Sequence, residues 1–147
     1  MTSEAVQASG GGGRAAARQR ALELLFEADQ RGVDLLELLE SRLASPELGG
    51  PVPAFTEALV RGVAEHREQI GEWLDTYSHG WTQDRMAAVD RAILYLGAYE
   101  VVWEDDVPDP VVLQAAADLA GSLSTDKSAN FVSGVLGRLS DLKETLL

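Results

Sequence analysis

The stretch from residue 81 to residue 103 constrains the fold of this chain more than any other. It reads WTQDRMAAVDRAILYLGAYEVVW. Its apolar residues recur at steps of three and four, which places Val89, Ala92, Ile93, Leu96 and Tyr99 on one helical face. This stripe runs too far for a surface helix, so neighbouring helices must cover it. We therefore expect residues 81–103 to form the central element, as one helix or as two successive ones, with Thr82 as its N-cap.

Similar periodicity predicts helices on both sides of this element. The expected ranges are 14–31, a second helix that begins after Asp34 and ends near Ser45, then 55–77, 109–123 and about 128–142. In the second helix, Asp34 and Glu37 form a capping box, and Leu35, Leu36, Leu39 and Leu43 turn inward. No segment alternates with period two, so strands are not expected. The fold class is all-α, with six or seven helices, preceded by a disordered tail over residues 1–13.

The chain contains no cysteine, so it has neither a disulfide framework nor a thiolate metal site. This suits a reducing cytoplasm, which is the expected location. The first residues, MTSEAVQASGGGG, lack the basic and apolar regions of a signal peptide, and no apolar run is long enough to span a membrane. At 147 residues, the chain fits one domain with a real core.

Charge is unevenly distributed along the chain. The net charge of −12 argues against broad attraction to nucleic acid. However, residues 1–20 carry Arg14, Arg18 and Arg20 against Glu4 alone. Arginine in a first helical turn opposes the helix dipole, and Arg14 and Arg18 continue the apolar stripe of residues 17–28. Either this helix projects past the core to contact RNA phosphates, or its first turn is a solvated overhang.

Nothing in the sequence indicates catalysis. There is no nucleophile motif, and His66 and His79 are the only histidines. His66 continues the stripe of the expected helix 55–77, so we interpret it as a partly buried histidine with a backbone or carboxylate partner rather than a metal ligand. We expect no enzyme activity, no cofactor and no metal.

Several motifs together match one family. They are RQRALELLFEADQRG at 18–32, ALVRGVAEH at 58–66, GWTQDRMAAVDRAILYLGAYEVV at 80–102, DVPDPVV at 106–112 and LSTDKSANFVSGVLGRL at 123–139. On these residues the chain resembles the NusB family of bacterial transcription antitermination factors, its actinobacterial members above all. The resemblance covers about residues 13–139.

This resemblance implies a fold of about seven helices in two packed helical subdomains, with residues 14–147 as the RNA-binding domain, and no enzymatic activity. It implies binding to the boxA element of nascent ribosomal RNA transcripts together with NusE, a ribosomal protein. The resulting RNA polymerase antitermination complex supports ribosomal RNA synthesis. No membrane partner is implied. Some family members dimerise, so a homodimer is compatible with the resemblance.

The family's functional surfaces map onto named residues here. The implied RNA-binding residues are Arg14, Arg18, Arg20, Tyr95, Asp126, Lys127, Asn130, Phe131 and Ser133. Asp90 and Arg91 are implied to lie near NusE. Phe131 either stacks a base or packs in the core with Val135 and Leu139.

Some positions depart from the family's pattern. Positive charge or hydrogen-bonding capacity is missing at Ala15, Ala16, Gln19, Tyr95 and Ser133. Fewer phosphate contacts lower both the affinity for RNA and its salt dependence. The alternative is therefore a protein-binding helical adaptor that contacts NusE but has largely lost RNA affinity.

Overall fold

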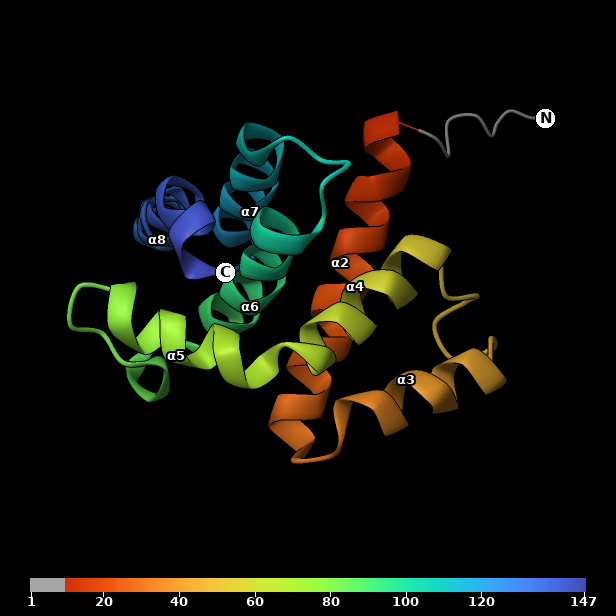
Figure 1. Ribbon diagram of the computed structural model, residues 1–147. Helices are drawn as coiled ribbons and strands as arrows, with labels where there is room; N and C mark the ends of the chain where they lie inside the picture. The colour runs from red at the N-terminus through yellow and green to blue at the C-terminus, as the bar shows by residue number, and fades with distance from the viewer. Residues whose placement is uncertain (1–9) are drawn as a thin grey trace. The chain divides into compact units, whose positions relative to one another are not determined.

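The computed structural model describes residues 10–147 (Figure 1). In this part of the chain there are seven α-helices, one 3-10 turn and no strand. The elements are α2 (Gly10–Arg31), α3 (Leu35–Ala44), α4 (Ala54–Glu65), α5 (Arg67–Tyr77), η1 (Gln83–Arg85), α6 (Ala88–Trp103), α7 (Asp109–Leu123) and α8 (Asp126–Leu146). The chain divides into two compact units, one ending at Ala64 and one running from Glu65 to Leu147. The predicted all-α fold is confirmed.

The N-terminal unit contains α2, α3 and α4. Asp34 caps α3 as predicted, because its Oδ2 accepts a hydrogen bond from the backbone N–H of Glu37 at 3.0 Å. Leu35 and Leu39 are buried, but Leu36 is 39% exposed and Leu38 is buried in its place. The prediction for Leu36 is wrong because this leucine-rich helix offers two overlapping apolar stripes, and only packing selects between them.

The expected helix 55–77 is two helices, α4 and α5, that meet at His66. Its φ of −107° and ψ of 16° interrupt the helical geometry. The imidazole lies flat against the indole of Trp103 on α6, with ring centroids 3.7 Å apart and planes 8° apart. His66 thus has an aromatic partner, where the sequence led us to expect a backbone or carboxylate one.

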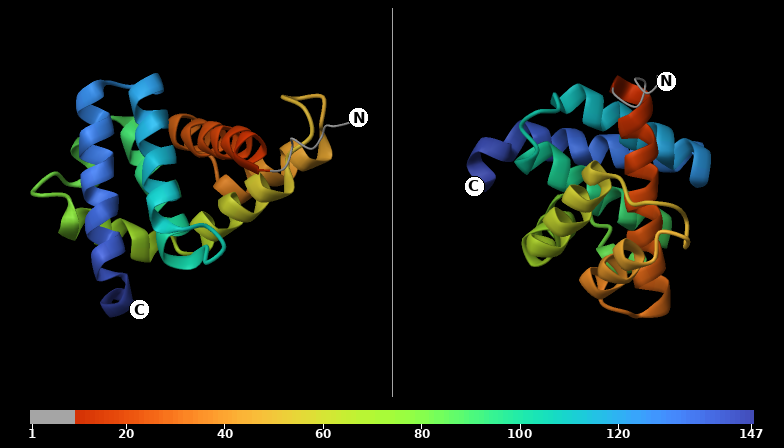
Figure 2. Two further views of the ribbon diagram at one scale, coloured as in Figure 1. Left: turned by 90° about the horizontal axis from the view of Figure 1, so that it is seen from above. Right: turned by 90° about the vertical axis from the view of Figure 1, so that its right-hand side faces the viewer.

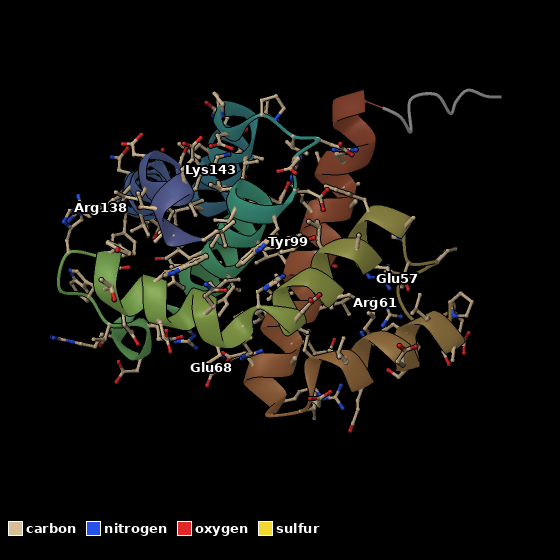
Figure 3. The ribbon with its side chains drawn as sticks, viewed as in Figure 1. Glu57, Arg61, Glu68, Tyr99, Arg138 and Lys143 are labelled. Atoms are coloured by element: carbon tan, nitrogen blue, oxygen red, sulfur yellow. The ribbon has the colours of Figure 1, made fainter. Side chains whose placement is uncertain are left out.

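The C-terminal unit is built around α6. The segment 81–103 is split, with η1 preceding α6. Gly97 lets α8 approach α6, because a Cβ at this position would lie only 2.5 Å from Leu136 Cδ1. Helices α7 and α8 run side by side (Figure 2). Near the end of α8, Lys143 Nζ (Figure 3) donates to Val101 O at 3.3 Å and to Asp109 Oδ1 at 3.0 Å, fastening the three helices together.

Several helix ends differ from the predicted ones. Helix α2 begins at Gly10, so residues 10–13 of the expected tail are helical, while residues 1–9 lie outside the described part of the chain. The sequence predicted a tail here because glycine is a poor helix former. Thr82 does not cap a helix with its side chain; its hydroxyl donates to Asp84 Oδ1 instead. None of the helices in residues 10–147 could cross a membrane.

Candidate nucleic-acid interface

Two of the predicted RNA-binding arginines, Arg14 and Arg18, lie over one aromatic ring of the N-terminal unit. Their guanidinium carbons are 4.4 and 5.5 Å from the centroid of Phe55 on α4. Arg18 is only 5% exposed, and Ala17 beside it is 1% exposed. The helix therefore does not project past the core at Arg18, as one of our two interpretations required. Arg14 is half-buried and is the more accessible of the two.

Arg20 has a structural task that the sequence did not reveal. Its guanidinium donates to three consecutive backbone carbonyls, those of Leu48 at 3.2 Å, Gly49 at 2.6 Å and Gly50 at 3.3 Å. Gly49 and Gly50 have φ values of 86° and 89°, a region that glycine adopts without steric cost. The glycine pair thus turns three carbonyls toward one guanidinium. Arg20 fixes the loop between α3 and α4.

The other predicted RNA-binding residues come together at the start of α8, in the C-terminal unit. Thr125 caps this helix, with its hydroxyl accepting from the N–H of Ser128 at 3.0 Å. The first turns carry three exposed residues, Asp126, Lys127 and Asn130, and two half-buried ones, Phe131 and Ser133. The helix start also presents the positive end of the helix dipole, which favours anions.

A groove of about 290 Å³ opens beside this helix start. We call it the Trp81 groove; it is lined by Trp81, Arg85, Met86, Ala87, Asp90, Lys127, Ser128 and Phe131. Phe131 thus lines a groove, whereas Val135 and Leu139, its expected core neighbours, are fully buried. Trp81 is 51% exposed, and Arg85 lies over its ring at 5.5 Å from the centroid. Neither residue was predicted from the sequence to bind RNA. The only sequence signal is that Trp81 directly follows the His79-Gly80 turn, outside the apolar stripe of α6.

Tyr95 does not lie on the surface. It is 9% exposed, its hydroxyl donates to Gln83 Oε1 at 2.5 Å, and Arg67 lies over its ring at 5.6 Å from the centroid. Burial is the main cause that raises the pKa of this phenol. The implied direct contact between Tyr95 and RNA therefore needs correction, because nearly every face of α6 is buried at this level.

The two residues implied to contact NusE are also held inside the C-terminal unit. Asp90 is 8% exposed, and its Oδ2 accepts from Ser128 Oγ at 2.8 Å. Its Oδ1 has no hydrogen-bond partner among the described residues. Arg91 is half-buried and donates from Nη1 to Gln83 O at 2.9 Å. Asp90 links α6 to α8, and Arg91 links α6 to η1.

These features define a class: an all-helical protein with a small aromatic and cationic groove at a helix start. The model of the NusB family matches residues 15–141. The transcription antitermination protein NusB of Thermobifida fusca is 50% identical over 135 residues, which is 92% of this chain and 94% of that protein. The chain belongs to the NusB family.

Solved structures agree with this assignment. NusB of T. maritima has a TM-score of 0.75 and 28% identity, and the likeness covers 87% of this chain and 90% of that one. A crystal structure of the antitermination factors NusB and NusE in complex with dsRNA gives a TM-score of 0.75 and 25% identity. That likeness covers 87% of this chain and 96% of the solved one.

Proposed function

We propose that this protein is a transcription antitermination factor that binds boxA RNA of nascent ribosomal RNA transcripts together with NusE. One observation carries the proposal: most of the chain is similar to a chain in a crystal structure of the antitermination factors NusB and NusE in complex with dsRNA. In this role the protein is a non-enzymatic member of an RNA polymerase antitermination complex in the cytoplasm. Residues 14–147 form its RNA-binding domain.

The structure supports two different roles for the implied site residues, direct contact with RNA and stabilisation of the fold. Lys127 and Asn130 are exposed beside the Trp81 groove and are free to meet phosphates and bases directly, with Phe131 inside the groove. Arg14 can add a phosphate contact from the N-terminal unit. Arg18, Arg20, Tyr95 and Arg91 are buried or hydrogen-bonded within their units, so in this proposal they stabilise their own units rather than contact RNA.

The adaptor alternative also has a structural observation in its favour. Of the three arginines near the N-terminus, Arg18 is buried and Arg20 donates its hydrogen bonds to the loop between α3 and α4. This leaves fewer cations for phosphate in a chain whose net charge is −12. A protein of this kind would bind NusE and contribute little RNA affinity of its own.

One titration separates the two functions. Labelled boxA RNA and an unrelated RNA of equal length are titrated with the full chain, with and without purified NusE, and anisotropy is recorded. We expect boxA RNA to bind more tightly than the unrelated RNA when NusE is present. Binding of NusE without any RNA preference would favour the adaptor, and failure to bind NusE at all would contradict both functions.

A further inference from the structure

The Trp81 groove has the components of a pocket for a single nucleobase. We propose that it holds one unstacked guanine of a single-stranded RNA, with Trp81 as the stacking surface and Asp90 as the acceptor that selects the base. The inference rests on the proposed function, because it names what one part of the RNA surface recognises. All residues concerned belong to the C-terminal unit.

The aromatic lining of the groove comes from two separate elements. Trp81 precedes η1 and Phe131 is on the second turn of α8, and both line the groove. A tryptophan that is 51% exposed leaves a large apolar ring in water. Bases that leave a stack are commonly held on such rings, and this stacking tolerates any base. The aromatic lining therefore explains binding of a base but not a choice among bases.

Asp90 supplies the choice. It lines the groove, its side chain is more than nine-tenths buried, and Ser128 occupies only one of its carboxylate oxygens. The second oxygen, Oδ1, is without a hydrogen-bond partner in residues 10–147. A buried acceptor left unsatisfied is unfavourable, and the N–H of a ligand would relieve this cost. The ligand must therefore present a donor, and a small shift of the groove wall must admit it.

Guanine fits this acceptor better than the other bases do. Its pairing edge carries two adjacent donors, N1–H and N2–H, with no lone pair on the neighbouring ring nitrogen. Uracil flanks its single N–H with two carbonyl oxygens, and cytosine and adenine place a ring lone pair next to their amino group. Each of these lone pairs would face a carboxylate. Cytosine can avoid this repulsion by offering its N4–H from the C5–H side, but only guanine offers two adjacent donors to the carboxylate.

Charges around the groove suit the backbone that would carry the base. Arg85 and Lys127 line the groove and can meet the adjacent phosphates, while Asp126 beside them is exposed and opposes binding. Because the charges around the groove are mixed, we expect moderate affinity for RNA, with selectivity coming from the base and not from the phosphates. It also predicts that weakening the groove leaves the contacts with the rest of the RNA intact.

The test uses the full chain with NusE and four labelled oligouridine 12-mers that carry G, A, C or U at one central position. We expect the G-containing RNA to bind about tenfold more tightly than the other three. Asp90→Asn keeps the size of the side chain and an acceptor for Ser128, and it should abolish the G preference without weakening binding of the all-U RNA. Trp81→Leu should weaken binding of the G-containing RNA by roughly 5- to 100-fold, whereas Trp81→Phe retains most of it. Thermal unfolding of each variant verifies that it is folded.

Two results overturn the inference. Equal affinity of the wild-type chain for all four RNAs is the first, and an unchanged G preference in Asp90→Asn is the second. If boxA RNA still binds with NusE in either case, the proposed function stands and only the guanine pocket is wrong. If the wild-type chain with NusE binds none of these RNAs or boxA, both are wrong.

Discussion

The N-terminal half of α2 and the start of α8 were both predicted to bind RNA, and they differ in how their polar side chains are used. At α2, Arg18 is buried and Arg20 donates to three loop carbonyls. At α8, Thr125 and Ser128 take the internal hydrogen bonds, and Lys127 and Asn130 remain exposed. Arg18 and Arg20 therefore serve the fold, whereas Lys127 and Asn130 face solvent.

A cluster of arginines in a sequence indicates that the chain could bind phosphate, but it does not show that the guanidinium groups are accessible. A guanidinium carries five N–H donors in a rigid fork, which suits converging backbone carbonyls as well as phosphates. The ammonium of Lys127 is a point charge on a flexible chain. It makes a weaker structural tie and a more accessible phosphate contact.

The largest expected effect is at the hydrogen bond that supports the α8 site. Ser128→Ala removes the hydroxyl that donates to Asp90 and leaves that buried carboxylate without its partner. We expect a loss of about 2–3 kcal/mol in the free energy of unfolding, measured by urea denaturation. Ser133→Ala, at a half-buried serine of the same helix, is the matched control and should cost far less. Equal losses in the two variants would contradict a special role for Ser128.

The next effect concerns acid stability and tests whether the charges of α2 serve the fold. The hydrogen bond from Arg42, helped by Arg31, lowers the pKa of Glu27 to about 2. Stability from this group is fully present above about pH 4.5 and is lost as the pH falls toward 2. The side chain is 29% exposed, so after allowance for solvent screening we expect about 1–2 kcal/mol.

Denaturation curves between pH 2 and 6 measure this contribution. Glu27→Gln should lower the free energy of unfolding at pH 6 by about 1–2 kcal/mol and flatten its pH dependence over that window. An unchanged slope in the variant would show that other carboxylates dominate the acid response.

A smaller effect is expected at the loop between α3 and α4. Arg20→Lys keeps the charge but cannot reach three carbonyls at once, so it should lower stability by about 1 kcal/mol and speed hydrogen exchange in residues 46–52. RNA affinity should stay the same. Gln19→Ala, at the exposed neighbouring position, is the control. Weaker RNA binding in Arg20→Lys, with unchanged hydrogen exchange in the loop, would show that Arg20 contacts RNA and does not serve the fold.

The smallest effect on stability, with an effect on binding, is expected at Lys127. Lys127→Ala removes an exposed charge, so the free energy of unfolding should change by less than about 0.5 kcal/mol. Binding of boxA RNA with NusE should weaken several-fold at low salt. A stability loss as large as that of Ser128→Ala would show that Lys127 supports the fold.

Local features of the fold were predictable from the sequence. The spacing of residues 81–103 predicted the central element, of which α6 covers residues 88–103, and Asp34 was recognised as a cap because its partner lies three residues away. The family resemblance then indicated the start of α8. Each of these signals is short-range or is carried by a whole motif.

Features that depend on distant partners were not predictable. Arg20 meets carbonyls 28 to 30 residues away, so nothing near it in the sequence shows that it is occupied. Helix α6 is buried on nearly all sides. The position of Tyr95 outside the apolar stripe therefore does not make it exposed, and the periodicity could not predict its burial. The Trp81 groove joins two segments about 45 residues apart, and only the folded chain brings them together.

One salt series tests the central claim, that RNA is bound with NusE through the start of α8, most directly. The dissociation constant of boxA RNA is measured with NusE between 50 and 200 mM salt for the wild-type chain, Lys127→Ala and Arg20→Gln, since both variants remove one positive charge. We expect the magnitude of the slope of log affinity against log salt to fall by about 0.7 in Lys127→Ala and to stay unchanged in Arg20→Gln. A reduced slope in Arg20→Gln together with a wild-type slope in Lys127→Ala would contradict the claim.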